Sequence, residues 1–512
     1  MAFKHGIYIL EEPTPIVPPV RVDAAMPVAF ITAPVHLSED PYGVTNDPRL
    51  CFQNSEAVRQ FGFSLRPEIW DNYTGPQMIF SQFSLFGVAP IVLVNVLDPK
   101  IHNDVVANKK QNLQGFSAIL STQDADEGGS LLNTWTPVEG VLIDTVTVRS
   151  AAAVVYEAGV HYTLSFNRDG HIVINAKEGV PGGISENEQL EFGYTKLAPE
   201  KVDIYDIIGG YDMQLDKNMG LEITEDIFPR FRMVPGQLLA PKYSADPVVA
   251  AVMETKGANI NGHFRCIVLN DMPTTTKNAS GEPVRLKYTD IPAFKNDNNF
   301  VFPRQLNGYP KLRLGNQTFY YSVQLAGLIG RTDHESGDIP YNSPSNKNLR
   351  INGLCDELGD EMVLNTMMAN FLNSQGIITA TNFTMGWTAW GNQTGAFPGN
   401  TDVKDAMIPV RRMFDWIGNT IVLTYWRKID FPLTPRRVTT IIDSINMWFN
   451  GLQAREFILG GRVDPLQEND NPLTDLLSGL VRFRVQIAPP PPFQAGEFIL
   501  QYDPEYLQTL FA

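Results

Sequence analysis

Metal-ligating side chains are scattered thinly along the sequence. The seven histidines never stand at the spacing of a helical zinc motif, and no HExxH pattern occurs. His161 and His171 flank the turn sequence NRDG (167–170), so the two rings could face one another across a hairpin. Two histidines do not complete a metal site, and we therefore expect no bound metal ion.

An acidic run offers a second candidate for cation binding. Asp124, Asp126 and Glu127 resemble the opening of a calcium loop. The twelfth position of such a loop needs a bidentate Glu, and in this sequence it holds Trp135. We therefore interpret the run as a solvated turn.

Sequence signatures of catalysis are also missing. The chain has no GxSxG elbow, no GxxxxGKS/T phosphate loop and no GxGxxG fingerprint. Asp271 follows a predicted parallel strand, at the end where α/β enzymes hold their sites, but an aspartate there is more often a cap or loop residue. We expect no enzymatic activity and no cofactor; an α/β enzyme with a β-rich accessory domain is the alternative interpretation.

Composition limits the remaining classes of protein. The 512 residues suffice for two to four domains, and 40 basic against 56 acidic side chains give a net charge of −16, which argues against nucleic-acid binding. No apolar run reaches the length of a membrane helix, and the first residues lack a signal-peptide layout, so we expect a protein assembled in the cytoplasm. Three cysteines without metal-ligand spacing predict reduced, buried thiols: Cys51, Cys266 and Cys355.

Positive charge gathers near the C-terminal end of this acidic chain. Two explanations stay open: ordinary solvated helix faces, or a patch that docks an acidic protein partner. The residues concerned are Arg411, Arg412, Arg427, Lys428, Arg436 and Arg437.

The elements that position these groups follow an α/β pattern in two blocks. Residues 26–98 read as strand, helix, helix and strand. After residue 200 the pattern resumes, and Asp246 caps a predicted helix that starts at Pro247, between two further strands. Between the blocks, short alternating strands predict a β-rich insertion over 101–199. The fold class is therefore α/β (α+β) and multi-domain.

The second half of the chain predicts three long helices and one long loop. Pro, Asn and Gly residues over 277–345 indicate a surface excursion, and 354–373 reads as a helix. Further helices are predicted at 406–422 and at 435–451, the latter with Thr434 as cap and Pro435 at its first position. A strand is expected at 481–487.

Both ends of the sequence combine a strand-like segment with prolines. A lone terminal strand leaves its N–H and C=O groups unpaired, so each end must add to a sheet, of its own chain or of a neighbour. The prolines keep the segments extended and favour the neighbour. The strand-forming residues are Ile7, Tyr8, Ile9 and Leu10 at one end, and Phe498, Ile499, Leu500 and Tyr502 at the other.

The sequence resembles the sheath proteins of contractile phage tails, R-type bacteriocins and other contractile injection systems. The similar stretches of sequence occur in the same order as in the family and cover most of the chain outside the insertion. It includes GIYILEEPTPIVPPVRVDAAMPVAFITAP, SQFSLFGVAPIVLVNVLDP, LLAPKYSADPVVAAVM, VRRMFDWIGNTI, PRRVTTIIDSINMWFNGLQAREFILGGRV, APPPP and FILQYD.

The resemblance implies a structural protein of the virion tail sheath, held in a metastable extended state until it contracts and drives a tail tube through the target envelope. It implies a homo-oligomer of stacked rings with a tube protein, a baseplate and a tail terminator as partners, and neither nucleic acid nor membrane. Phage, bacteriocin and toxin-injecting device stay open.

The resemblance also implies a division of the chain and roles for several residues. We expect an N-terminal arm (1–25), an α/β domain (26–100 plus 200–375), an outer β-rich insertion (101–199), a C-terminal core domain (376–493) and a C-terminal arm (494–512). The arms would add to a neighbour's strand that includes Val481, Phe483, Val485 and Ile487. The candidates for tube contact are Arg436 and Arg437, with Arg411 and Arg412 as competitors.

Overall fold

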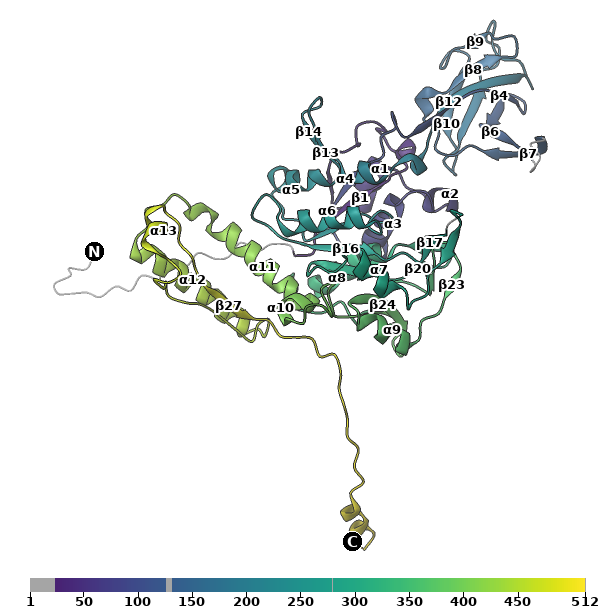
Figure 1. The fold of residues 1–512 in the computed structure, drawn as a ribbon. Helices are drawn as coiled ribbons and strands as arrows, with labels where there is room; N and C mark the ends of the chain where they lie inside the picture. The colour runs from purple at the N-terminus through teal and green to yellow at the C-terminus, as the bar shows by residue number, and fades with distance from the viewer. Residues whose placement is uncertain (1–23, 126–130, 279, 512) are drawn as a thin grey trace, which may run out of the picture.

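The computed structural model describes residues 24–125, 131–278 and 280–511 (Figure 1). Its centre is an eight-stranded sheet in the order β2-β3-β1-β15-β16-β19-β24-β25. The six inner strands are parallel, and the two edge strands run antiparallel to their neighbours. The strands are β1 (Pro27–Ile31), β2 (Arg49–Cys51), β3 (Ile91–Asn95), β15 (Gln237–Leu239), β16 (Ile267–Asp271), β19 (Gln305–Gly308), β24 (Ile377–Asn382) and β25 (Trp387–Trp390).

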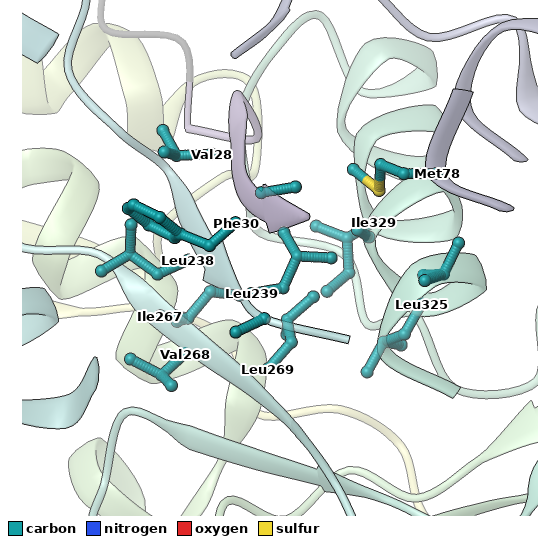
Figure 2. Close-up of a cluster of buried hydrophobic side chains, with 14 of the residues drawn as sticks. Val28, Phe30, Met78, Leu238, Leu239, Ile267, Val268, Leu269, Leu325 and Ile329 are labelled. Atoms are coloured by element: carbon teal, nitrogen blue, oxygen red, sulfur yellow. The ribbon is translucent and has the colours of Figure 1, made fainter. Parts of the chain in front are cut away.

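Apolar side chains on both faces of this sheet build the main core. Every residue of β1, β3 and β16 is buried, as expected for parallel strands covered by helices. Figure 2 shows side chains of β1, β15 and β16 beside Met78, Leu325 and Ile329, which belong to helices α3 (Gly75–Ile79) and α8 (Tyr321–Glu335). Helix α6 (Pro247–Ala258) begins as predicted, because the Asp246 carboxylate accepts the backbone N–H groups of Val248 and Val249.

The other helices of this part are short. The first of the two helices predicted within residues 26–98 is α1 (Asn54–Phe61), and the second is α3 followed by a π-helix, η2 (Phe80–Phe86). The remaining ones are α2 (Pro67–Trp70), α4 (Ile204–Ile208), α5 (Thr224–Phe231) and α7 (Ile291–Asp297).

The prediction of a surface excursion over 277–345 is wrong. This stretch contains β19, an inner strand of the sheet, and α8, which is buried along most of its length. Strand β19 was missed because two of its four residues are polar. Inside the core, the Asn307 side chain accepts a hydrogen bond from Asn270 and donates one to the carbonyl of Phe300. The helix was missed because it has no continuous polar face.

The prediction of one helix over 354–373 is wrong in its first half. Only α9 (Thr366–Asn373) is helical. Before it, β22 (Gly353–Cys355) and β23 (Glu361–Met362) join β20 (Lys311–Leu314) and β21 (Gln317–Phe319) in a four-stranded sheet. A turn at Gly359, with φ of 85°, breaks the helical pattern.

The described residues between 103 and 197 form β-rich structure with a hydrophobic core of its own, at the far end of the molecule in Figure 1. The long strands β4 (Asn103–Asn112) and β12 (Gln189–Leu197) pair from Asn103↔Leu197 onward, so the chain enters and leaves this part side by side. The other strands are β5 (Ser117–Ile119), β6 (Ser121–Ala125), β7 (Leu131–Pro137), β8 (Thr147–Ser150), β9 (Val155–Tyr156), β10 (Tyr162–Phe166) and β11 (Ile172–Ala176).

A helical part follows the sheet toward the C-terminal end. After α10 (Val403–Ala406), helix α11 (Ile408–Tyr425) leads from the sheet to α12 (Pro435–Gln453), α13 (Leu473–Leu477) and a two-stranded sheet of β26 (Gly460–Val463) and β27 (Val485–Ala488) (Figure 1). Because β24 and β25 belong to the large sheet, we propose that the C-terminal domain starts near residue 403 instead of 376.

Two small hairpins complete the described strands. They are β13 (Gly210–Asp212) with β14 (Lys217–Met219), and β17 (Thr275–Lys277) with β18 (Pro283–Arg285). None of the helices in the described ranges has both the length and the hydropathy needed to span a bilayer.

Candidate assembly interface

The two-stranded sheet of β26 and β27 exposes a strand edge. The backbone amide of Asp464 donates to the carbonyl of Arg484 (3.0 Å), so Arg484 and Gln486 direct their backbone groups toward β26. Alternate residues of an antiparallel pair point the other way, which places the N–H and C=O groups of Val485 and Ile487 on the outer edge of β27. No residue that the structure describes pairs with that edge.

The two faces of β27 differ in chemistry. Phe483, Val485 and Ile487 are half-buried and pack against the main core. Arg482 and Arg484 point to the exposed face, where they form ion pairs with Asp475 and Asp470. The predicted receiving residues Val481, Phe483, Val485 and Ile487 thus alternate with exposed ones; the regular strand itself covers only the last two.

The partner strand β26 is fixed from the other side by helix α12. The Asn446 side chain accepts the backbone N–H of Val463 (2.7 Å), and its amide group lies 3.4 Å from the Val463 carbonyl. The outward backbone groups of Val463 are therefore already satisfied. The available edge lies on β27.

The predicted C-terminal arm runs away from the body (Figure 1). Gln494 contacts Met407, and beyond it no hydrogen bond joins residues 495–511 to the rest of the described chain. Phe498, Ile499 and Leu500 are 90%, 93% and 95% exposed. Three consecutive apolar side chains of this segment are thus exposed to solvent, which is unusual for a segment without a partner surface. The predicted N-terminal arm, Ile7, Tyr8, Ile9 and Leu10, lies outside the described residues.

The structure separates the four arginines proposed for tube contact. Arg436 and Arg437 lie in the first turn of α12 and are exposed. Arg437 donates to the Pro432 carbonyl (2.9 Å), and its guanidinium lies 5.1 Å from the centre of the Phe431 ring. Neither arginine forms an ion pair with a residue in the described ranges.

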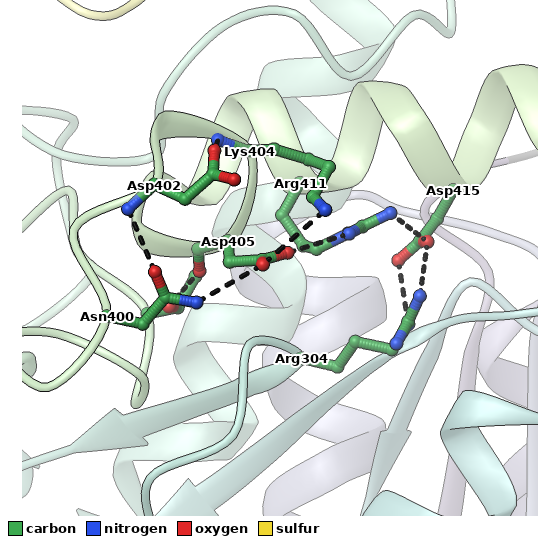
Figure 3. Close-up of polar contacts among 8 residues, drawn as sticks. Arg304, Asn400, Asp402, Lys404, Asp405, Arg411 and Asp415 are labelled. Carbon is green, nitrogen blue, oxygen red and sulfur yellow. Dashed lines mark hydrogen bonds and ion pairs between the residues drawn. The ribbon is translucent and has the colours of Figure 1, made fainter.

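Arg411 and Arg412 are not surface residues, which corrects the prediction that they compete for tube contact. Arg411 donates to Asp405 (3.1 Å) and Asp415 (2.9 Å), and Arg304 holds the same Asp415 carboxylate from the sheet (Figure 3). The Arg412 side chain is buried against Asp333. These arginines fasten α11 to the body.

Asp271 has a structural role. Its carboxylate accepts the backbone N–H of Ser322 (2.8 Å) and the hydroxyls of Ser322 and Ser244. Burial raises the pKa of Asp271 to about 6, against the lowering effect of these hydrogen bonds. The residue joins β16 to the first turn of α8, and both of its carboxylate oxygens accept hydrogen bonds from the chain itself.

The metal-ligating residues singled out in the sequence are not brought together. His171 contacts Glu139 and Arg66 at the base of the insertion, whereas the carbonyl of His161 accepts the N–H of Lys177 (2.9 Å). Asp126 and Glu127 lie outside the described residues, and the residues that are described contain no cluster of metal-binding side chains. The three cysteines are buried and free, as predicted.

Sequence reasoning missed an exposed leucine face on α13. Leu473 and Leu477 are one helical turn apart, and they are 71% and 78% exposed; Leu480, which follows the end of the helix, is 46% exposed. The signal was present in the i, i+4 spacing of the first two leucines, but the run is too short to stand out against ordinary surface leucines.

The chain is similar to known proteins in sequence and in fold. It is similar along its length to the tail sheath protein of Burkholderia phage BcepMu, with 24% identity over 534 aligned residues that cover 99% of this chain and 98% of the relative. A chain in the baseplate structure of the anti-feeding prophage shares the fold, with a TM-score of 0.54, 15% identity, and 98% and 100% of the two chains covered. The contracted helical sheath of the same particle gives 0.53, 14%, and 98% of each chain. No family model matches the chain.

An open strand edge and an exposed apolar arm are features through which one chain can pair with another. In sequence, the chain is similar along nearly its whole length to a phage tail sheath protein, and its fold is similar to that of a chain in a contracted helical sheath. This relationship confirms the resemblance and the fold class that the sequence predicted.

Proposed function

We propose that this chain is the self-assembling subunit of a contractile tail sheath that surrounds a tail tube and shortens to drive it through a cell envelope. The observation that carries the proposal is the exposed apolar arm 495–511, which belongs to the same chain as the open edge of β27. A chain that carries both an unpaired strand and an unpaired edge joins its own copies in series.

Strand exchange is the proposed linkage. Residues 498–502 of one copy add to the outer edge of β27 in another, where Val485 and Ile487 offer their N–H and C=O groups. Successive side chains of a strand point to opposite faces, so Phe498 and Leu500 share one face of the added strand. Full burial of each of these two side chains would contribute about 1.5–3 kcal/mol to the linkage. We propose the same role for the N-terminal arm.

The proline segment sets the reach of this linkage. Residues 489–497 include four consecutive prolines, and nine residues in a polyproline conformation span about 28 Å. An extended tether of this length bridges neighbouring bodies and leaves them free to rotate. Contacts between bodies can then change during contraction while the chains stay linked.

We propose that Arg436 and Arg437 contact the tail tube. Cations at the N-terminus of a helix are unfavourable next to the positive end of the helix dipole. Their exposed position in the first turn of α12 is explained by an acidic partner surface. A tail terminator and assembly in the bacterial cytoplasm are further parts of the proposal.

The proposed subunit needs no catalysis. Energy is stored when the sheath assembles in an extended state that a barrier keeps from relaxing, and triggering at the baseplate releases it. We therefore expect neither enzymatic activity nor a cofactor.

Electron microscopy of the purified chain tests the proposal. We expect striated hollow tubes, and discrete particles at all protein and salt concentrations would contradict a sheath. Removal of residues 494–512 is expected to abolish tubes without lowering the melting temperature, because residues 495–511 have no hydrogen bond to the described body.

A matched pair of proline variants tests the receiving edge. Val485→Pro removes an N–H that points outward, so β27 still pairs with β26 but offers one donor fewer to an incoming strand. Gln486→Pro removes an N–H that points toward β26 and disturbs the folded sheet itself. Loss of tubes with a retained melting temperature is expected only for Val485→Pro; normal tubes from that variant would contradict exchange at this edge.

A further inference from the structure

We propose that the helical turn η7 (Pro504–Phe511) docks on the exposed leucine face of α13 in a second copy, and that this contact makes the exchanged strand run antiparallel to β27. The inference rests on the proposed strand exchange and adds a direction and a second contact to it. The leucine face is defined as Leu473 and Leu477 of α13 together with Leu480, which follows the helix.

The turn is an unpartnered apolar element. Tyr506 and Leu510 are 74% and 76% exposed, and Leu507 is half exposed. The Asp503 carboxylate caps the turn by accepting the N–H of Glu505 (2.9 Å). Isolated helical segments of this length are marginal in water, and 3₁₀ segments are normally shorter still. A turn of this kind becomes stable when its apolar side chains are covered by another surface.

The leucine face lies beside the first residues of the receiving strand. Asn471, which comes just before α13, accepts the backbone N–H of Arg482 (2.7 Å). Asp470 binds Arg484 through both carboxylate oxygens (2.7 and 3.0 Å). These bonds hold α13 next to residues 481–484, where β27 begins.

The direction of the added strand decides where the turn arrives. Five residues of strand span about 17 Å, slightly more than the four residues of β27. An antiparallel strand 498–502 ends beside Val485, and the turn two residues later then reaches α13. A parallel strand would carry the turn to the opposite end, near Ala488 and Leu459.

Charge favours the antiparallel direction. Residues 493–511 contain three acidic side chains and no Lys or Arg, and two of the acids, Asp503 and Glu505, lie at the start of the turn. In the antiparallel direction these acids arrive near Arg482 and Arg484, whose side chains are 51% and 57% exposed beside their own partners. The other end of β27 continues as Ala488 and four prolines, without a charged side chain.

The first test removes the turn and keeps the strand. Deletion of residues 504–512 leaves 498–502 in place, and we expect sheaths to form only at a protein concentration raised on the order of tenfold or more, because buried leucine area is lost. The double variant Leu473→Ser with Leu477→Ser is expected to raise the required protein concentration in the same way. Leu459→Ser, which changes an exposed leucine at the opposite end of the strand, is the matched control. Assembly of the turn deletion at the wild-type concentration would overturn the proposal.

The second test measures direction through a disulfide between copies. Chains carrying Leu507→Cys are mixed with chains carrying Leu477→Cys or Leu459→Cys and oxidised after assembly; the native cysteines are buried. We expect a mixed dimer with Leu477→Cys alone. A mixed dimer with Leu459→Cys, or with neither variant, would overturn the proposal. If deletion of 494–512 also left assembly intact, strand exchange itself would be wrong, which is a separate outcome.

Discussion

Arg412 of α11 donates hydrogen bonds from both terminal guanidinium nitrogens to the two carboxylate oxygens of Asp333 of α8. The two side chains are only 3% and 2% exposed. The pair joins the helix that leads to the C-terminal part to a helix packed on the central sheet. Together with the cluster of Arg304, Asp415, Arg411 and Asp405, it ties the start of α11 to the body through ion pairs (Figure 3).

Breaking this buried pair is expected to destabilise the whole chain. Arg412→Ala leaves the Asp333 carboxylate buried without its partner, and such a change costs about 3–5 kcal/mol. Denaturant unfolding measures the loss. Arg455→Ala, at an exposed arginine of the same charge, is the control and is expected to stay within about 0.5 kcal/mol of wild type. Equal effects of the two variants would show that the pair is not buried in solution.

Two helical glycines predict opposite effects of the same substitution. A Cβ at Gly327 of α8 would collide with the Phe86 ring, so Gly327→Ala is expected to cost about 1–3 kcal/mol. A Cβ at Gly418 of α11 meets nothing within 4 Å, and Gly418→Ala is expected to stabilise by up to about 1 kcal/mol. Melting temperatures of the two variants check both signs, and a rise for Gly327→Ala would disprove the close packing.

Glu254 makes stability depend on pH. Burial, with a further contribution from Asp415, raises the pKa of Glu254 to about 8, while Arg304 and Arg411 act in the opposite direction. The folded protein therefore keeps a proton that the unfolded chain loses above its ordinary pKa of 4.5, and the resulting stability declines as the pH rises toward 8.

Glu254→Gln removes this titration. Between pH 5 and pH 8 the wild type is expected to lose stability relative to the variant, at a limiting slope of about 1.4 kcal/mol per pH unit. Unfolding curves at several pH values measure the difference. Parallel pH profiles would mean that Glu254 is ionised in the folded protein.

The tube contact predicts a defect in assembly without a defect in folding. Arg436→Glu with Arg437→Glu places acids at a helix N-terminus, which does not lower the melting temperature. In particles made together with the tube protein, we expect sheaths that are empty of tube, counted by electron microscopy. Arg455→Glu, near the other end of α12, is the control. Tube-filled sheaths from the double variant would remove these arginines from the interface.

The two arginine pairs also show where sequence reasoning stops. The sequences VRRM (410–413) and PRRV (435–438) are similar, and both predict solvated helix faces. Burial of Arg412 depends on Asp333, which is 79 residues away in sequence. The Asp415 that binds Arg411 is held by Arg304, 111 residues away, so no local pattern could reveal this burial either. The second pair is exposed, as the sequence predicts, because exposure is the default for arginine.

Elements with strong local signals were predicted well. Helix α6 was predicted from Asp246 and Pro247. The hairpin of β10 and β11 was predicted from the NRDG turn, in which the Asn167 side chain accepts the N–H groups of Asp169 and His171. Strand β19 and helix α8 were missed because their burial comes from the sheet around them and leaves no periodic pattern. The exposed arm could be predicted from its prolines, whereas the leucine face on α13 needed the fold.

The pairing of Asn103 with Leu197 has a practical consequence for engineering. Because the chain leaves and returns through neighbouring strands, and the segment between them has a separate core, the segment can be exchanged as a cassette. A foreign domain whose ends lie about 5 Å apart fits the same two attachment points. The chain would then serve as a scaffold that displays such a domain once per subunit.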